Sequence, residues 1–207
     1  MEYLKKRETE KFTNDLKEEK GALSSRKDVS IVLEQMLDAN AARGHIVPDA
    51  YNLNEEALTL LTAGNDTTAN SMILGAYYIC SHPEVKAKLV DELRKTFPSP
   101  GDMITYTAVK QLPYITAVIK EILRCANPLP GRLPRVVPAD GCTINGNFVK
   151  AGTIVHTSAY LLNRHPSIWG KTAKDFDPDR WLEESSPELD KYMTSFYRGS
   201  RQCLGMQ

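Results

Sequence analysis

The residues with the clearest potential for chemistry lie in one ten-residue segment, residues 196–205, which reads Phe-Tyr-Arg-Gly-Ser-Arg-Gln-Cys-Leu-Gly. Its cysteine, Cys203, lies between Gly199 and Gly205, and glycine lets a backbone turn tightly and approach a flat partner closely. Arg201 is a nearby cation that favours the thiolate over the thiol and could hold an anionic group of that partner. A thiolate at the base of a Gly-rich turn can hold haem iron by its sulfur. The alternative is an ordinary free cysteine in a loop.

A second polar segment, Gly-Asn-Asp-Thr-Thr at residues 64–68, interrupts the longest apolar stretch of the chain, residues 57–80. Gly64 leaves room for a partner against the backbone, and a mid-helix threonine can turn its hydroxyl onto the preceding turn and bend the helix. Asp66 and Thr67 form an acid–hydroxyl pair that can relay protons from water to a bound reactant. The alternative is a kinked helix whose polar pair faces a loop.

The third pattern is a charge pair, Glu121 and Arg124, spaced three residues apart on a predicted helix. This spacing places both side chains on one helix face, and the apolar neighbours indicate that the pair is at least partly buried. Because most such pairs are solvated, the pattern alone leaves a surface ion pair open.

Helices of the first two-thirds of the chain must position these groups. Asn54 is a good N-cap for the apolar helix that ends near residue 80. Ser-His-Pro-Glu at residues 81–84 combines a capping-box spacing with a proline in the first turn. Apolar periodicity predicts helices over 54–80, 83–97 and 112–125, and one that begins at residue 29 and is ended by Gly44 and Pro48. A charged helix is predicted over 1–28.

The sequence pattern changes from helical spacing to short strands after Asn127. Short strands are expected at 135–137, 143–144, 148–149 and 153–156, and Asn145-Gly146 is a strong hairpin-turn signal. Residues 163–195 are expected to be mostly irregular. The fold class predicted is mainly α with a small β region, in three stretches of one domain over residues 1–207: the charged helix 1–28, the helical part 29–126, and the β region, long loop and Cys203 loop 127–207.

Composition narrows the class of protein. Net charge is zero, with 26 basic and 26 acidic residues, which gives no electrostatic case for nucleic acid or an anionic membrane surface. The four cysteines form no Cys-x-x-Cys pair, so a zinc site is not favoured. The charged residues after Met1 do not resemble a signal peptide, and the broken apolar stretch reads as a buried helix rather than a span. We therefore expect a soluble, cytoplasmic chain without a membrane span.

Taken together, the motifs resemble the cytochrome P-450 (haem-thiolate) monooxygenase family. Phe-x-x-Gly-x-Arg-x-Cys-x-Gly at 196–205 matches the family's haem-binding signature at every fixed position. Ala-Gly-x-Asp-Thr-Thr at 63–68 is similar to its oxygen-binding motif, and Phe-Asp-Pro-Asp-Arg-Trp at 176–181 to its aromatic-Pro-acid-Arg segment. The motifs occur in family order from about Lys27 to Gly205, and the residues of the sequence resemble most those of fungal members that act in secondary metabolism.

The resemblance implies a role for each residue. Cys203 would be the axial ligand of the iron of haem b, Arg135 would reach a haem propionate, with Arg132 the weaker candidate, and Thr67 would steady dioxygen while Asp66 helps to deliver protons. Arg180 would join Glu121 and Arg124 in a buried triad that pins the long loop to the core. The implied cofactor-binding residues are Gly64, Arg135, Phe196, Gly199, Arg201 and Cys203.

The implied activity is insertion of one oxygen atom of dioxygen into a small hydrophobic organic substrate, with electrons from NADPH through a reductase partner. The family normally has a long N-terminal half with a membrane anchor of the endoplasmic reticulum, and a further helix after the ligand cysteine. We therefore expect a C-terminal part of the family fold, incomplete at both ends. The alternatives are a catalytically inactive remnant or interaction module that binds no haem, and a small haem sensor that uses Cys203 alone.

Overall fold

The computed structural model describes residues 32–206 of the chain, which divides into two compact units, Met1–Asn65 and Asp66–Gln207. The boundary falls inside the long helix α3 (Ala50–Ser81), within the polar segment 64–68. The charged helix predicted over residues 1–28 lies outside the described residues. A single domain over residues 1–207 stays a prediction.

In the first unit, helix α2 (Val32–Leu37) ends earlier than Gly44 and Pro48 predict. Helix α3 then begins at Ala50, and the Asp49 carboxylate accepts a hydrogen bond from the backbone N–H of Asn52 at 2.8 Å. Asn54 therefore lies inside the helix, and the prediction that it is the N-cap was wrong. The reason is that Asp49 is an equally good capping residue and occurs first along the chain.

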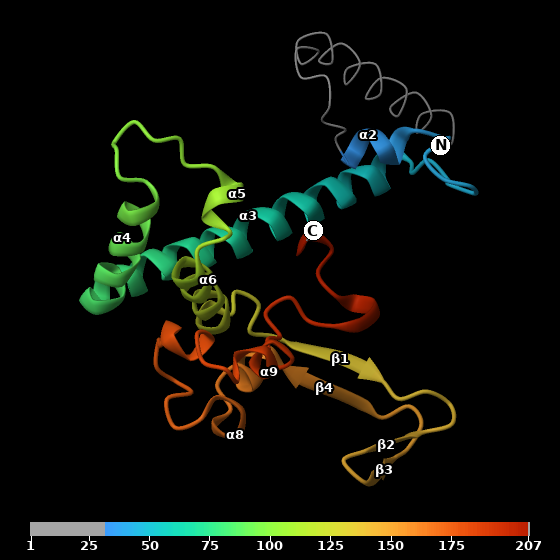
Figure 1. Ribbon diagram of the computed structural model, residues 1–207. Helices are drawn as coiled ribbons and strands as arrows, with labels where there is room; N and C mark the ends of the chain where they lie inside the picture. Colours follow the sequence, from blue (N-terminus) through green and yellow to red (C-terminus); the bar gives the residue numbers. More distant parts are fainter. Residues whose placement is uncertain (1–31, 207) are drawn as a thin grey trace. The chain divides into compact units, whose positions relative to one another are not determined.

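In the second unit, the rest of α3 is followed by the helices α4 (Pro83–Thr96), α5 (Tyr106–Val109) and α6 (Pro113–Ala126) (Figure 1). Helix α3 continues through the polar segment, where the Ser71 hydroxyl donates to the Thr67 carbonyl at 2.9 Å. Pro83 occupies the first turn of α4 as predicted, but the capping box does not form. The Ser81 hydroxyl instead donates to the Tyr78 carbonyl at 3.3 Å, because Ser81 still belongs to α3.

Helix α6 carries the charge pair, and its start is fixed by another helix. Its cap residue, Leu112, has no side chain that can accept a hydrogen bond. The Glu92 carboxylate of α4 accepts instead from the backbone N–H groups of Tyr114 and Ile115, each at 2.8 Å. The helix ends at Asn127, whose φ of 43° is left-handed. The positive end of the helix dipole lies at the N-terminus of α6, and the negative carboxylate of Glu92 interacts favourably with it. Glu92 therefore fixes α4 to α6.

Four short strands follow, as predicted, with shifted bounds. Strand β1 (Arg132–Val136) pairs antiparallel with β4 (Ile154–Ser158), and β2 (Cys142–Ile144) pairs with β3 (Asn147–Val149). Asn145 and Gly146 both have positive φ, 48° and 78°, which confirms the predicted hairpin turn. β1 begins three residues earlier than expected, and Pro134 is tolerated there because each sheet has only two strands.

Residues 163–195 are mostly irregular, as expected, and short helical turns occur over residues 159–206. These turns are α7 (Ala159–Leu162), α8 (Pro166–Trp169), η1 (Pro178–Trp181), α9 (Ser186–Asp190), η2 (Gly199–Arg201) and η3 (Leu204–Met206). The fold class is confirmed as mainly α with small sheets.

Two apolar clusters on either side of α6 hold the second unit together. One joins Val85 and Leu89 of α4 to Val118, and Tyr78 stacks on Phe176 with ring centroids 4.4 Å apart. The other packs Ala117 against Trp169 and Trp181. The irregular segment is therefore fixed to α6 by aromatic residues rather than by regular secondary structure.

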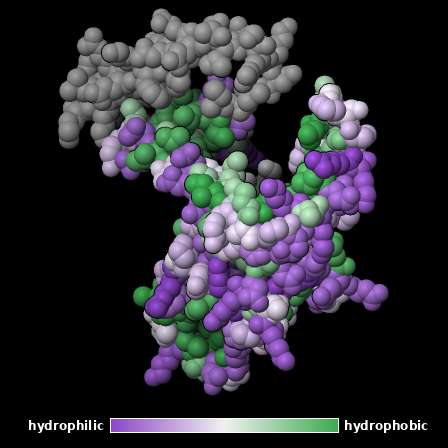
Figure 2. Space-filling view, turned by 90° about the vertical axis from the view of Figure 1, so that its left-hand side faces the viewer, coloured by the Kyte–Doolittle hydropathy of each residue, from purple (hydrophilic) through white to green (hydrophobic). Residues whose placement is uncertain are grey.

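Apolar side chains also lie on the surface, where they form patches between hydrophilic residues (Figure 2).

Candidate functional site

The Cys203 loop is a tight backbone turn. The N–H of Cys203 donates to the Phe196 carbonyl at 2.9 Å, and the N–H of Gln202 donates to the Gly199 carbonyl at 3.0 Å. Gly199 has a φ of 79°, a left-handed conformation that an L-residue adopts only at a cost. Cys203 is a free, exposed cysteine, and Phe196 is half-buried. The turn therefore holds the thiol on the surface of the second unit.

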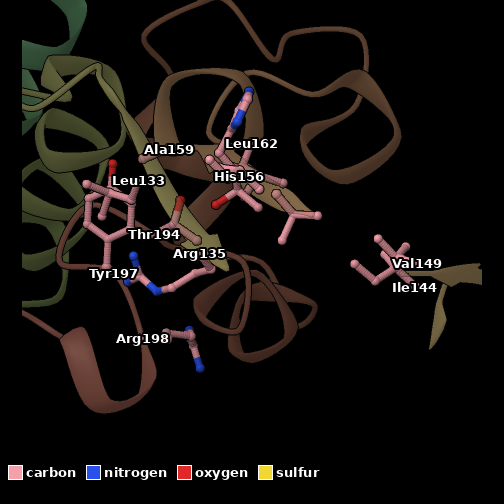
Figure 3. Close-up of a pocket in the computed structure, with 13 residues that line it drawn as sticks. Leu133, Arg135, Ile144, Val149, His156, Ala159, Leu162, Thr194, Tyr197 and Arg198 are labelled. Atoms are coloured by element: carbon pink, nitrogen blue, oxygen red, sulfur yellow. The ribbon is translucent and has the colours of Figure 1, made fainter. Parts of the chain in front are cut away.

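A hollow of about 720 Å³ lies beside the start of this loop and is lined by strands β1 and β4 (Figure 3). Arg135, Tyr197 and Arg198 line it together with apolar residues such as Leu133 and Leu162. The Arg135 guanidinium is exposed and donates only to a neighbouring carbonyl, that of Pro134, at 2.8 Å among the interactions described. Arg135 can therefore turn toward an anionic group at the edge of the hollow.

Arg201 and Arg198 are both exposed cations of the Cys203 loop with different surroundings. Arg198 donates to the Asp190 carbonyl at 2.6 Å, which ties it to α9. Arg201 lies in the turn η2, two residues before Cys203. Its position is suited to an anionic partner beside the thiol.

Glu121 forms the most buried polar centre of the second unit. Its side chain is fully buried and accepts two hydrogen bonds from Arg124, at 2.7 and 2.9 Å. The Arg180 Nε donates to the same carboxylate at 3.1 Å and the Trp181 indole N–H at 2.9 Å. The backbone N–H of Asp177 adds a bond of 2.9 Å. The structure thus brings Glu121, Arg124 and Arg180 together, with the two arginines meeting at the carboxylate.

Backbone carbonyls of the irregular segment accept further hydrogen bonds from both arginines. Arg124 donates to the carbonyls of Asn163, Ala173 and Asp175 at 2.6–2.7 Å, and Arg180 donates to those of Trp169 and Thr172. Burial by itself lowers the pKa of Arg124, but the hydrogen bond and the charge of Glu121 outweigh it and raise the pKa above its ordinary value. Arg124 therefore stays charged, and the hydrogen bonds of both arginines fix the path of residues 163–180.

Sequence reasoning missed two members of this network. Trp181 follows Arg180 directly, so its neighbour could have suggested it. Asn163 is fully buried and contacts both Arg124 and the segment before Cys203. No spacing or composition signal marks this asparagine, because its partners lie about 30 to 40 residues away on both sides.

The residues of the predicted oxygen-binding motif lie on α3. Thr67 is half-buried and Asp66 is exposed, and both belong to the second unit. Gly64 belongs to the first unit, and a Cβ added there would meet no atom within 4 Å. Gly64 therefore has open space beside its Cα, and its part in cofactor binding stays a prediction.

Comparison with known proteins decides the family. The family model described as Cytochrome P450 matches residues 3–207. The chain belongs to the cytochrome P450 family. This confirms the resemblance that the motifs indicate, and family membership implies haem as the cofactor.

Similar P450 proteins are found in fungi and among solved structures. Cytochrome P450 monooxygenase sol6 of Alternaria solani is 52% identical over 90% of this chain, and aneF of Aspergillus aculeatus is 37% identical over the same share. A crystal structure of a mutant cytochrome P450DA heme domain matches 82% of this chain with a TM-score of 0.66 and 25% identity. The chain spans 40% and 37% of the two relatives and 36% of the solved chain.

The residues around Cys203 fit a haem group. A free, exposed thiol can supply the sulfur ligand, and no neighbour crowds it at Gly205, where an added Cβ would make only an ordinary van der Waals contact with the Cys203 Sγ, at 3.9 Å. Arg201 and Arg135 are exposed, and a guanidinium in such a position can pair with a carboxylate. Within residues 32–206, no group of three or more His, Cys, Asp and Glu side chains could hold a metal ion, and no helix has the length and apolar character of a membrane span.

Proposed function

We propose that this chain supplies the iron-ligand part of a haem-thiolate monooxygenase, which inserts one oxygen atom of dioxygen into a small hydrophobic substrate in fungal secondary metabolism. The observation that carries the proposal is the Cys203 turn, which holds a free thiol between two glycines and two residues after an arginine. The names of the similar fungal proteins, all P450 monooxygenases, support the reaction class.

Each site residue has a defined task in this proposal. Cys203 binds the iron of haem b as the thiolate, while Arg201 and Arg135 hold the propionates, and Phe196 and Gly199 shape the turn. When bound, the haem supplies oxygen activation, which a thiolate ligand favours by donating electron density. Gly64 leaves space against α3, Thr67 holds dioxygen through its hydroxyl, and Asp66 moves protons toward it. Glu121, Arg124 and Arg180 keep the polypeptide around the loop in place.

Two further parts of the proposal concern partners and location. NADPH supplies the electrons through a reductase, by analogy with the family. By analogy with the family, the whole protein is placed at the endoplasmic-reticulum membrane. Both follow from family membership and need their own tests, such as electron transfer from a purified reductase.

A haem titration of the purified 207-residue chain, followed by reduction and exposure to carbon monoxide, tests the proposal. We expect one haem per chain and the red-shifted absorption band of a thiolate-ligated carbon monoxide complex. Cys203→Ala should lose that band, whereas Cys80→Ala, which removes another exposed cysteine, should keep it. A thiolate band that persists in Cys203→Ala would refute the assignment of the ligand.

A second candidate function is an inactive remnant or interaction module that binds no haem. The exposure of Cys203, Arg201 and Asp66 favours it, because side chains open to water give little of the apolar surroundings that haem requires. The titration separates the two candidates. If the parent chain takes up no haem while it remains folded, this second function replaces the first.

A further inference from the structure

We propose that Asn163 is a positioning residue that fixes the start of the Cys203 loop to the buried Glu121 network. The proposal rests on the proposed function for what the loop holds, but its structural part concerns the chain alone. Asn163 lies just after helix α7, far from Cys203 in sequence, and its side chain is fully buried.

The side chain of Asn163 contacts the two residues that precede Phe196. Its Oδ1 accepts from the Thr194 hydroxyl at 3.0 Å and from the Thr194 N–H at 3.4 Å. Its Nδ2 donates to the Ser195 hydroxyl at 3.3 Å, and that hydroxyl donates to the Leu123 carbonyl of α6 at 2.8 Å. The amide group of Asn163 therefore holds both residues where the loop leaves the core.

The backbone of Asn163 makes the connection to the ion-pair network. Its carbonyl accepts from the Arg124 Nη1 at 2.6 Å, in the same guanidinium that binds Glu121. Its N–H donates to the Ala159 carbonyl at 2.8 Å, which closes helix α7. A side-chain substitution removes the contacts to the loop but leaves the carbonyl that Arg124 uses. The loop can thus be released without removing a partner of the buried charges.

The loop needs such an anchor, because it contains a strained residue. Tyr197 has a φ of 55°, an unusual conformation for an aromatic residue, which persists only where its surroundings hold it. The backbone N–H of Tyr197 donates to the Thr194 carbonyl at 2.9 Å, so this contact also depends on Thr194. The other contacts lie on the surface: the Tyr197 hydroxyl donates to the carbonyls of Leu129 and Gly131 at 3.4 and 3.5 Å, and the exposed Arg198 donates to the Asp190 carbonyl at 2.6 Å. The position of the Phe196 carbonyl, which accepts from the Cys203 N–H, therefore depends on the fixed pair Thr194 and Ser195.

Amide hydrogen exchange of the haem-free 207-residue chain tests this inference. We expect the Cys203 amide to exchange roughly tenfold faster in Asn163→Ala, because a lost buried hydrogen-bond set opens the loop more often. Amides in the middle of α6 should change less. The control is Thr172→Val, which removes a hydroxyl 3.3 Å from Arg180 on the other side of the network and should leave the Cys203 amide unchanged.

Three exchange results would overturn the inference. One is a Cys203 amide that is as unprotected as an unstructured peptide in the parent chain. Another is an unchanged rate at Cys203 in Asn163→Ala. The third is an equal acceleration at Cys203 and in α6, which would mean that Asn163 serves stability only.

A milder variant keeps the test informative if Asn163→Ala does not fold. Thr194→Val removes one hydroxyl that donates to Asn163 and should accelerate exchange at Cys203 by a smaller factor. Where Asn163→Ala does fold, the effects of the two substitutions should not multiply in the double variant, since both break the same contact. Fully multiplicative effects would contradict the proposal.

Haem binding gives a spectroscopic reading of the same idea. In the loaded chain, Asn163→Ala should lower the fraction of the carbon monoxide complex that shows the thiolate band, and Thr172→Val should not. If the parent chain takes up no haem, the proposed function fails while the exchange result still decides the role of Asn163. Normal haem uptake together with unchanged exchange at Cys203 would instead refute the role of Asn163 alone.

Discussion

Glu121 and Cys203 both belong to cytochrome P450 motifs, and both lie in the second unit of this chain, but their surroundings are opposite. Glu121 has no exposed surface and accepts hydrogen bonds from two arginines, an indole and a backbone N–H. Cys203 is exposed, and only its backbone is held, by the Phe196 carbonyl.

This difference separates two tasks that the family motifs perform. A buried carboxylate with every oxygen engaged fixes the path of the chain, and its partners depend on it because they are buried charges. An exposed thiol contributes little to folding and remains available for a ligand. The chain therefore completes the hydrogen-bond network of Glu121 within its described contacts, whereas the Cys203 side chain stays accessible to the ligand that we propose.

The largest effect is expected at the buried carboxylate. Glu121→Ala leaves Arg124 and Arg180 charged without their partner and should lower the free energy of unfolding by about 3–5 kcal/mol. The matched control is Glu188→Ala in α9, whose pair with Lys191 has the same three-residue spacing but is mostly exposed, and which should cost about 0–1 kcal/mol. Urea unfolding followed by circular dichroism measures both. Equal effects in the two variants would remove the distinction between the regions.

Alkaline pH should weaken the buried region next. Burial raises the pKa of the Cys125 thiol to about 11 from the ordinary value of 9.0. Between these values the unfolded chain has released the thiol proton and the folded chain has kept it, so stability that is complete below pH 9 is lost as the pH rises toward 11. The loss attributable to this thiol should be about 2 kcal/mol.

Unfolding free energies measured at several pH values from 8 to 11 check this expectation, and Cys125→Ala should flatten the decline. Cys80→Ala, which removes an exposed cysteine, should not alter it. A decline of unchanged steepness in Cys125→Ala would assign the effect to other groups. The raised pKa values of Tyr78 and Tyr114, both caused first by burial, add a smaller decline in all variants.

A smaller effect is expected in the backbone of the exposed loop. Gly199→Ala places a Cβ at a φ of 79°, where it meets no atom within 4 Å, so the cost is conformational and should be about 1 kcal/mol. Gly64→Ala, at a helical position with the same open space, should instead stabilise by up to about 1 kcal/mol. Thermal unfolding distinguishes them by opposite shifts in Tm, and a shift of the same sign would show that the turn is not formed in solution.

The smallest effect on stability is expected at the proposed ligand itself. Cys203→Ala should change the free energy of unfolding of the haem-free chain by less than about 0.5 kcal/mol, because the side chain is exposed. The same variant should lose the thiolate spectrum. A large loss of stability would mean that the thiol is packed, and would make this loop similar to the Glu121 region.

The helices and the hairpin show most clearly how far the local sequence predicts the fold. Apolar periodicity located α4 and α6 within about two residues, and Asn145-Gly146 identified the turn between β2 and β3, because these signals act between neighbours. Helix starts were less certain. Asn54 and Ser81 both have capping chemistry, but Asp49 and the continuation of α3 occupied those roles.

The candidate site divides in the same way. The amino-acid sequence by itself determined the family, the Cys203 motif and the three-residue spacing of Glu121 and Arg124, since each depends on residues that lie close together in the sequence. Only the tertiary structure decided that Trp181 donates to the buried Glu121, that Glu92 caps α6 and that Asn163 holds Thr194. These contacts join residues 22 to 60 positions apart, so they exist only after hydrophobic packing has brought the segments together.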